Sequence, residues 1–487
     1  MINLVEKSLY SNFLIRANLF IFLFLWGFTY YNLKLILFPL LFFSIFALIK
    51  LIKNYKEIYF KFNLIFFLFI LHKVLGDIFT ESFVLKDYVM LCFFFSFLIF
   101  LYYKNNFVFK NLKNLIFLFA IIIPIYLILE WTFGPTKFEF VMIDCNYGWF
   151  SQRKLTYFNA IDQNSFSFIL PLLFQENSHF GMISVPIISY LTIYIFKREN
   201  LNYKLIIFYV VILFSFGTVV STTYFAMLLT TSLIGIFFLN TNKIQKFIFL
   251  SLILYCFYSI STNYQCNTRF YDTAWEVKRN VLISTKNYLV KINPNIREPE
   301  KNENKLSEKI IFKLYNAIDF LNSGTETFYE GVIKKMSEKQ EKEKNINRDD
   351  FPTNLSTEVF LHSVDVFNKS VFDNIFGWGF YNYEDAFEEK KSTLNYRNIV
   401  GYLNKKDASG NLIKILVEYG IFSLFLVYVI IKFLSLNGIS NENKIFFLSI
   451  VLTQLLRGAG YFNGGFVFAI SIMIISVIIN DKKIKNE

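Results

Sequence analysis

The sequence predicts an all-α, polytopic membrane protein, a bundle of about 12 transmembrane helices with one large loop outside the membrane. Two observations lead to this fold class. Hydrophobic residues make up 55% of the 487 residues, whereas charged residues make up only 18%, below the roughly 25% of soluble domains. The apolar residues also fall in blocks of about 17–22, long enough to cross a bilayer. A soluble enzyme, a disordered chain and a disulfide scaffold are therefore excluded.

The apolar blocks follow one another from near the N-terminus. Met1 to Arg16 mixes polar and apolar residues, and the block after it has no A-x-A-like cleavage site, so we expect a retained first helix rather than a signal peptide. Several blocks are bounded by Lys pairs or by Tyr and Trp, as interfacial anchors are. The predicted spans are 13–31, 33–52, 59–76, 83–103, 112–131, 160–196, 204–219, 222–239, 246–261, 411–433, 444–460 and 463–480.

One of these spans, 160–196, is interrupted by the polar run from Gln175 to His179. It fits either one crossing with a short added piece or two crossings. Cytoplasmic loops collect Lys and Arg, and the basic clusters all fall on one side only if this segment makes one net crossing. That gives twelve spans with both termini inside. The clusters are Lys7 and Arg16; Lys50, Lys53, Lys56 and Lys61; Lys104, Lys110 and Lys113; Lys197, Arg198 and Lys204; Lys243 and Lys246; and Lys482, Lys483 and Lys485.

Two long stretches, about 132–160 and 262–410, then lie on the outer face. The chain divides into residues 1–261 with nine spans, the outer loop 262–410, and residues 411–487 with three spans and a tail. Within the loop, apolar residues at helical spacing predict an amphipathic helix over 305–321. A second helix is expected from Thr357 to Phe367, leading into a Gly-punctuated turn from Asn374 to Phe380. A loop of this length is typical of a lid over a site.

Charge and motifs exclude several functions. The net charge of +12 agrees with basic cytoplasmic loops, and no recognition motif accompanies it, so we expect no nucleic-acid partner. No P-loop, GxGxxG, HExxH or GxSxG is present, and three His residues argue against a multi-histidine metal centre. We expect no cofactor. Cys145 and Cys266 both fall in outer stretches, where they form either a disulfide or two unpaired thiols.

Two arginines beside predicted spans are candidates for binding a phosphate group. Arg153 precedes the sixth span, where its planar guanidinium suits a diphosphate; the alternative is an interfacial arginine that extends to water. Arg457 interrupts an apolar run in a glycine-rich segment between the last two spans. An ionisable residue at that depth is a functional candidate.

Other candidates are acid–base groups. His362, in the outer-loop helix, has the chemistry of a general base, although a lone His is more often a satisfied polar residue. Asp87 and Glu130 fall at or within the fourth and fifth spans, facing either the bundle interior or the outer interface.

Three segments resemble the bacterial O-antigen polymerase/ligase family, which comprises Wzy-type polymerases and O-antigen ligases. Arg153 to Asn164 resembles the family's Arg and Phe-Asn-x-Asn approach to a span. Asn374 to Phe387 is similar to its Asn-Pro-Leu-Phe-Gly-x-Gly turn, and Ser409 to Leu424 to its His-Asn…Leu…Glu-x-Gly segment. Two departures weaken the ligase interpretation: Gly410 stands where ligases carry a His, and Ser221-Thr222-Thr223 lacks the Arg that often follows. The setting of Arg457 looks like that of the polymerases.

The resemblance implies a GT-C-like polytopic inner-membrane bundle with a periplasmic loop and a glycosyltransferase activity at the periplasmic face. The donor would be a glycan on undecaprenyl diphosphate, and the acceptor the terminal sugar of another lipid-linked repeat unit. No metal is implied; a chain-length regulator and a flippase are implied partners. The alternatives are an O-antigen ligase that uses lipid A-core as acceptor, and a lipid-linked oligosaccharide transporter, although no inverted repeat is found.

The residues expected to act follow from this resemblance. We expect Arg153 and Arg457 on the diphosphate, and His362 or Asp407 as the base. The remaining candidates contact the substrate or shape the loop: Arg269, Arg348, Asn159, Asn164, Gly377, Gly379 and Asn411.

Overall fold

The computed structural model describes most of the predicted spans and parts of the outer stretches. Within the described residues the regular secondary structure is helical apart from two short antiparallel pairs, which agrees with the predicted all-α class. Strands β1 (Thr29–Tyr30) and β2 (Leu33–Lys34) form one pair, and β3 (Asn146–Tyr147) and β4 (Phe150–Ser151) the other. The described residues are 12–25, 29–30, 33–133, 146–147, 150–151, 177–197, 202–217, 222–262, 285–291, 313–316, 318, 355–371, 373–390, 405–406, 408–458, 460–462 and 465–486.

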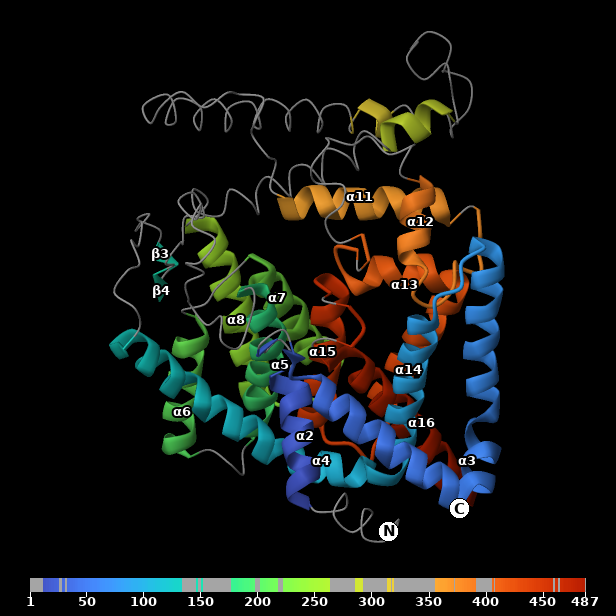
Figure 1. Ribbon diagram of the computed structural model, residues 1–487. Helices are drawn as coiled ribbons and strands as arrows, with labels where there is room; N and C mark the ends of the chain where they lie inside the picture. The colour runs from blue at the N-terminus through green and yellow to red at the C-terminus, as the bar shows by residue number, and fades with distance from the viewer. Residues whose placement is uncertain are drawn as a thin grey trace. The chain divides into compact units, whose positions relative to one another are not determined.

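The helices follow the predicted order of apolar blocks (Figure 1). Ahead of the outer loop come α2 (Asn12–Phe24), α3 (Leu37–Thr80), α4 (Leu85–Phe133), α5 (Asn177–Ile195), α6 (Tyr203–Gly217), α7 (Thr222–Phe237) and α8 (Lys243–Thr262). The later elements are α11 (Leu355–Ser370), α12 (Tyr383–Lys390), α13 (Asn411–Tyr419), the 3₁₀ turn η8 (Gly420–Ser423), α14 (Leu424–Ser435), α15 (Asn441–Leu456) and α16 (Phe466–Asn486).

Helices α3 and α4 each join two predicted spans into one helix. The polar stretches that we expected to be loops, around Lys53–Lys61 and Lys104–Lys113, are helical except at Asn54, because Lys and Glu do not break a helix as Gly and Pro do. A straight helix of the 44 residues of α3 would extend about 66 Å, twice a hydrocarbon core of about 30 Å. Asn54 leaves the helical conformation (φ −125°, ψ 33°), and the two halves of α3 run in different directions (Figure 1).

Among the described residues, three helical segments are long and apolar enough to cross a membrane: Leu37–Thr80, Leu85–Ile125 and Asn411–Ser435. Five shorter apolar helices accompany them, including Gly181–Ile195 and Phe466–Asn480. The described residues therefore contain three helices that could span a membrane. Half of the interrupted segment 160–196, from 160 to 176, lies outside the described residues.

The chain forms two compact units. One comprises Met1–Asn263 with Val359–Glu487, and the other Tyr264–Glu358. The end of the outer loop, from residue 359, thus belongs to the same unit as the apolar helices. In the second unit Tyr315 and Ile318 pack with Leu289. Of the helix predicted over 305–321, residues 313–316 and 318 are described and helical.

Phenylalanines form much of the core of the first unit. The ring of Phe97 on α4 lies 4.9 Å from Phe22 on α2, 5.2 Å from Phe43 on α3 and 5.8 Å from Phe468 on α16, centroid to centroid. Such aromatic contacts stabilise beyond the area that they bury. They join the first helices of the chain to its last one.

Candidate functional site

The candidate site is built around the predicted turn after α11. The Asn374 side-chain amide donates to the Gly377 carbonyl at 2.8 Å, and its oxygen accepts from the Phe376 N–H at 3.1 Å. Gly377 and Gly379 have φ of +91° and +99°, which glycine adopts at little cost. A Cβ on Gly377 would also collide with the Glu418 carbonyl oxygen. The expected Gly-punctuated turn is confirmed.

This turn is fastened to α13 by its backbone. The Trp378 N–H donates to the Val417 carbonyl at 3.0 Å, and the Gly379 N–H to the Glu418 carbonyl at 2.9 Å. The Trp378 ring is buried in a cluster that includes Val366 of α11. The predicted helix over 357–367 is confirmed as α11, and three of its apolar side chains pack against this cluster: Phe360, Val364 and Phe367.

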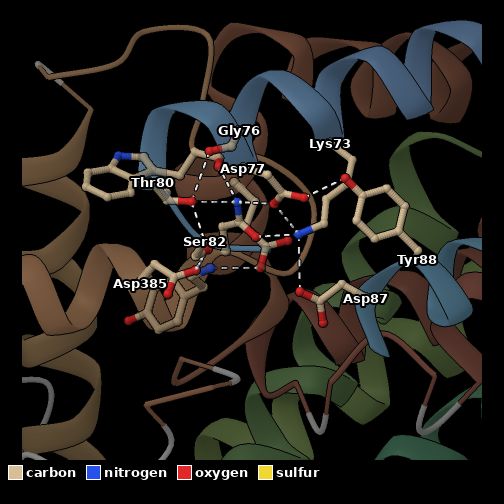
Figure 2. A network of polar contacts seen from close by, with 12 residues as sticks. Lys73, Gly76, Asp77, Thr80, Ser82, Asp87, Tyr88 and Asp385 are labelled. Carbon is tan, nitrogen blue, oxygen red and sulfur yellow. Dashed lines mark hydrogen bonds and ion pairs between the residues drawn. The ribbon is translucent and has the colours of Figure 1, made fainter. Parts of the chain in front are cut away.

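A buried ion cluster lies where the turn meets the ends of α3 and α4; we call Lys73, Asp77, Asp87 and Asn382 the Lys73 cluster (Figure 2). The Lys73 ammonium is fully buried and donates to Asp77 Oδ1 at 2.7 Å, to Asp87 Oδ2 at 3.1 Å and to Asn382 Oδ1 at 2.6 Å. Because an ammonium has three N–H donors, this set matches its full capacity. One side chain therefore joins α3, α4 and the turn.

Asn382 fixes the turn in this cluster. Its amide nitrogen donates to Asp77 Oδ1 at 3.1 Å and to the Trp378 carbonyl at 3.0 Å. Asp77 also accepts from the Tyr88 hydroxyl at 2.6 Å. Burying a charge is expensive unless it is paired and hydrogen-bonded. The pairing of Lys73 and Asp77 meets that requirement.

A chain of hydroxyls extends from the cluster to the half-buried Asp385 (Figure 2). Thr80 Oγ1 lies 2.9 Å from Ser82 Oγ, which donates to Asp385 Oδ2 at 3.1 Å. Burial raises the pKa of Asp385, while the Ser82 hydrogen bond and the Lys73 charge pull that pKa down. A carboxyl group with a raised pKa at the rim of the site is suited to exchange protons.

A second polar cluster surrounds Glu418 of α13. We call it the Glu418 cluster, and its members are Lys414, Glu418, Tyr381 and Tyr461. Glu418 is fully buried and accepts from the Tyr461 hydroxyl at 2.7 Å. The Lys414 ammonium lies 4.0 Å from Glu418 Oε1. It also lies 4.6 Å from the Tyr381 ring centroid and 4.8 Å from that of Tyr461, within cation–π range.

Arg457 follows the last residue of α15 and is half-buried. Its neighbour Gly458 lies against Asn411, the first residue of α13, so closely that a Cβ on Gly458 would collide with the Asn411 amide oxygen. Asn411 is buried, and among the residues that the structure describes neither polar atom of its side chain has a hydrogen-bond partner. Of the predicted residues, Arg457 and Asn411 are thus brought to one place. Gly379 lies against Asn382 of the Lys73 cluster, whereas Gly377 lies against the backbone of Glu418 and Tyr419.

The other predicted residues are described in part or not at all. His362 lies in α11, where only its backbone is described. Cys92 and Cys256 are free cysteines, whereas Cys145 and Cys266, expected to form either a disulfide or two unpaired thiols, lie outside the described residues. So do Arg153, Asn159, Asn164, Arg269, Arg348 and Asp407.

Lys73, Asp77 and Asn382 were not among the residues predicted from the sequence. A signal was present, since Lys73 and Asp77 stand four residues apart at the end of an apolar block, a spacing that pairs side chains on one helix face. Asp87 was expected to face either the bundle interior or the outer interface. It is buried and pairs with Lys73 in the interior. In the part of the chain that the structure describes, no group of three or more His, Cys, Asp or Glu residues could hold a metal ion.

Comparison with known proteins gives no match to a family model, to a curated protein or to a solved structure.

Proposed function

We propose that the protein is a membrane glycosyltransferase that polymerises lipid-linked repeat units on the outer face of a bacterial inner membrane. The observation that carries the proposal is the meeting of three distant segments. The turn 374–383, helix α13 and the segment that begins at Arg457 contact one another through Trp378, Glu418 and Tyr461. The first two carry the family resemblance, and the third carries the arginine assigned to the diphosphate.

The site contains groups suited to each part of this reaction. The acceptor hydroxyl oxygen forms a bond to the anomeric carbon of the donor, and the bond from that carbon to the phosphate oxygen breaks. The lipid diphosphate leaves with the electron pair, and Arg457 would stabilise its charge. The hydroxyl proton passes to a base. His362 and Asp407 stay candidates for that role, and the half-buried Asp385 joins them.

The buried Lys73 cluster supports this proposal by providing a rigid base for the turn. A site that holds a sugar and a diphosphate in reactive geometry needs its loops fixed, and Lys73 with Asn382 fixes the turn to the ends of α3 and α4. Buried ionisable groups also mark ion and proton paths in transporters, so transport of a lipid-linked glycan is the competing function.

The test is a surface-glycan gel of a deletion strain complemented with wild type, Arg457→Ala or Arg16→Ala. Arg16 is exposed on α2 and serves as the control for losing an arginine. We expect Arg457→Ala, like the deletion, to collapse the ladder to core plus one repeat, and Arg16→Ala to leave it intact. Lipid-linked polymer without transfer to the core would indicate a ligase instead. An unchanged ladder in the deletion strain would refute both, whereas loss of every repeat, with no polymer accumulating, would favour the transporter.

A further inference from the structure

We propose that Tyr381 is a specificity-determining residue whose aromatic ring packs against a sugar ring of the lipid-linked glycan. The inference rests on the proposed function and adds to it the residue that contacts the sugar. It arises from an unusual backbone conformation in the turn before α12. Tyr381 has φ of +68°, in the left-handed region that bulky L-residues avoid.

The surroundings of Tyr381 hold it in this conformation. On one side, Gly379 approaches Gly76 of α3 so closely that a Cβ on Gly379 would lie 2.9 Å from the Gly76 Cα. On the other side, Asn382 is bound within the Lys73 cluster, and the Tyr383 N–H donates to Glu418 Oε1 at 3.3 Å. The backbone on both sides is therefore fixed, and the strain at Tyr381 cannot relax. Strained residues that the surrounding structure holds in place cluster at functional sites.

Exposure distinguishes Tyr381 from its neighbours. Phe380, Asn382 and Tyr383 are all buried, whereas Tyr381 keeps part of its surface accessible. Glycine or asparagine would adopt this conformation at lower cost. The conformation thus presents an aromatic ring at the surface of the site at a cost in stability.

The setting of the ring suits a sugar. Its centroid lies 4.6 Å from the Lys414 ammonium and 5.6 Å from the Tyr461 ring, which stands edge-on to it. A pyranose presents a face of C–H groups, which packs on aromatic rings, and a rim of hydroxyls, which bind to charged and polar groups. Sites for such amphipathic ligands combine aromatic walls with a few polar groups. Tyr381 supplies the partly exposed aromatic wall, and the buried Lys414 ammonium, which donates to the Lys406 carbonyl at 2.7 Å, holds its ring within the Glu418 cluster.

The experiment compares Tyr381→Phe, which keeps the ring, with Tyr381→Asn, which removes the ring but tolerates the left-handed conformation. Phe83→Asn is the control, because Phe83 is an exposed aromatic (72%) on the turn between α3 and α4. The full-length proteins are assayed in nanodiscs, with lipid-linked repeat unit extracted from the deletion strain as substrate. Polymer formation is measured against substrate concentration, and the unfolding midpoint of each variant is measured in parallel.

We expect Tyr381→Asn to raise KM about tenfold, with kcat little changed and an unfolding midpoint equal to or above that of wild type. Tyr381→Phe and Phe83→Asn should keep KM within about twofold. A wild-type KM in Tyr381→Asn would overturn the inference, as would a loss of activity that only follows a loss of folded protein. Those results leave the polymerase proposal standing. If wild-type protein forms no polymer from this substrate, the proposed function fails, and the sugar contact fails with it.

Discussion

Replacing Lys73 by Met should destabilise the protein far more than an ordinary ion-pair deletion. The substitution keeps the length and apolar stem of the side chain but removes its charge, which leaves Asp77 and Asp87 buried without a cation. Deleting one partner of a buried ion pair costs about 3–5 kcal/mol, because the remaining charge stays desolvated. The loss of the hydrogen bond to Asn382 also releases the turn.

The same helix offers a matched control. Lys61 pairs with Glu57 at 2.9 Å, also four residues apart, but the two side chains are 18% and 43% exposed, against 0% and 7% for Lys73 and Asp77. An exposed pair of this kind contributes about 0–1 kcal/mol. Lys61→Met should therefore change the free energy of unfolding only slightly, although it removes the same chemical group.

The assay is the free energy of unfolding in mixed detergent micelles, together with the rate of proteolytic cleavage in the turn 374–383. Lys73→Met should lower the free energy of unfolding and raise the cleavage rate. The double variant Lys73→Met with Asp87→Asn should recover part of the lost stability, since it removes one of the two uncompensated charges. Equal effects of Lys73→Met and Lys61→Met would refute the reasoning from burial. Failure of the double variant to recover stability would refute the assignment of the loss to charge.

Three further perturbations test the turn and its partners. Gly377→Ala should cost more than about 2 kcal/mol, because alanine disfavours φ of +91° and its Cβ collides with the Glu418 backbone; a wild-type unfolding midpoint would contradict this. Tyr461→Phe removes a donor to the buried Glu418 and should cost about 1–3 kcal/mol, whereas an unchanged midpoint would mean that Glu418 finds another donor. The raised pKa of Asp385 means that its ionised form disfavours folding. Asp385→Asn should therefore be more stable than wild type at neutral pH, and this advantage should disappear on acidification below the usual carboxyl value of 3.8; an advantage independent of pH would contradict this account.

The all-α class and the turn 374–383 could be predicted from sequence because local rules govern both. Apolar block length predicts helices that cross a bilayer, and glycine at alternating positions predicts a turn with positive φ, as at Gly377 and Gly379. Helix ends were less predictable. The Lys-rich stretches inside α3 and α4 look like loops by hydropathy but contain good helix formers.

The Lys73 cluster could not be predicted because its partners are far apart in the sequence. The pair of Lys73 and Asp77 is local, but the contact between Lys73 and Asn382 spans 309 residues. No periodic pattern of residues in the sequence indicates such a distant contact. The same holds for Tyr461 and Glu418, which stand 43 residues apart. The strain at Tyr381 is set by the surrounding packing, and a tyrosine in a turn gives no sequence signal of a positive φ.

The distance along the chain between Lys73 and Asn382 has a consequence for biosynthesis. A ribosome adds about 5–20 residues per second, so Asn382 is made roughly 15–60 seconds after Lys73. During that interval α3 enters the membrane with its lysine and without the partner that completes the site. Asp77, one helical turn away on the same helix, is already there as a counter-ion. The nascent helix therefore carries its own charge compensation, and the late arrival of Asn382 completes the cluster only after most of the chain has been synthesised.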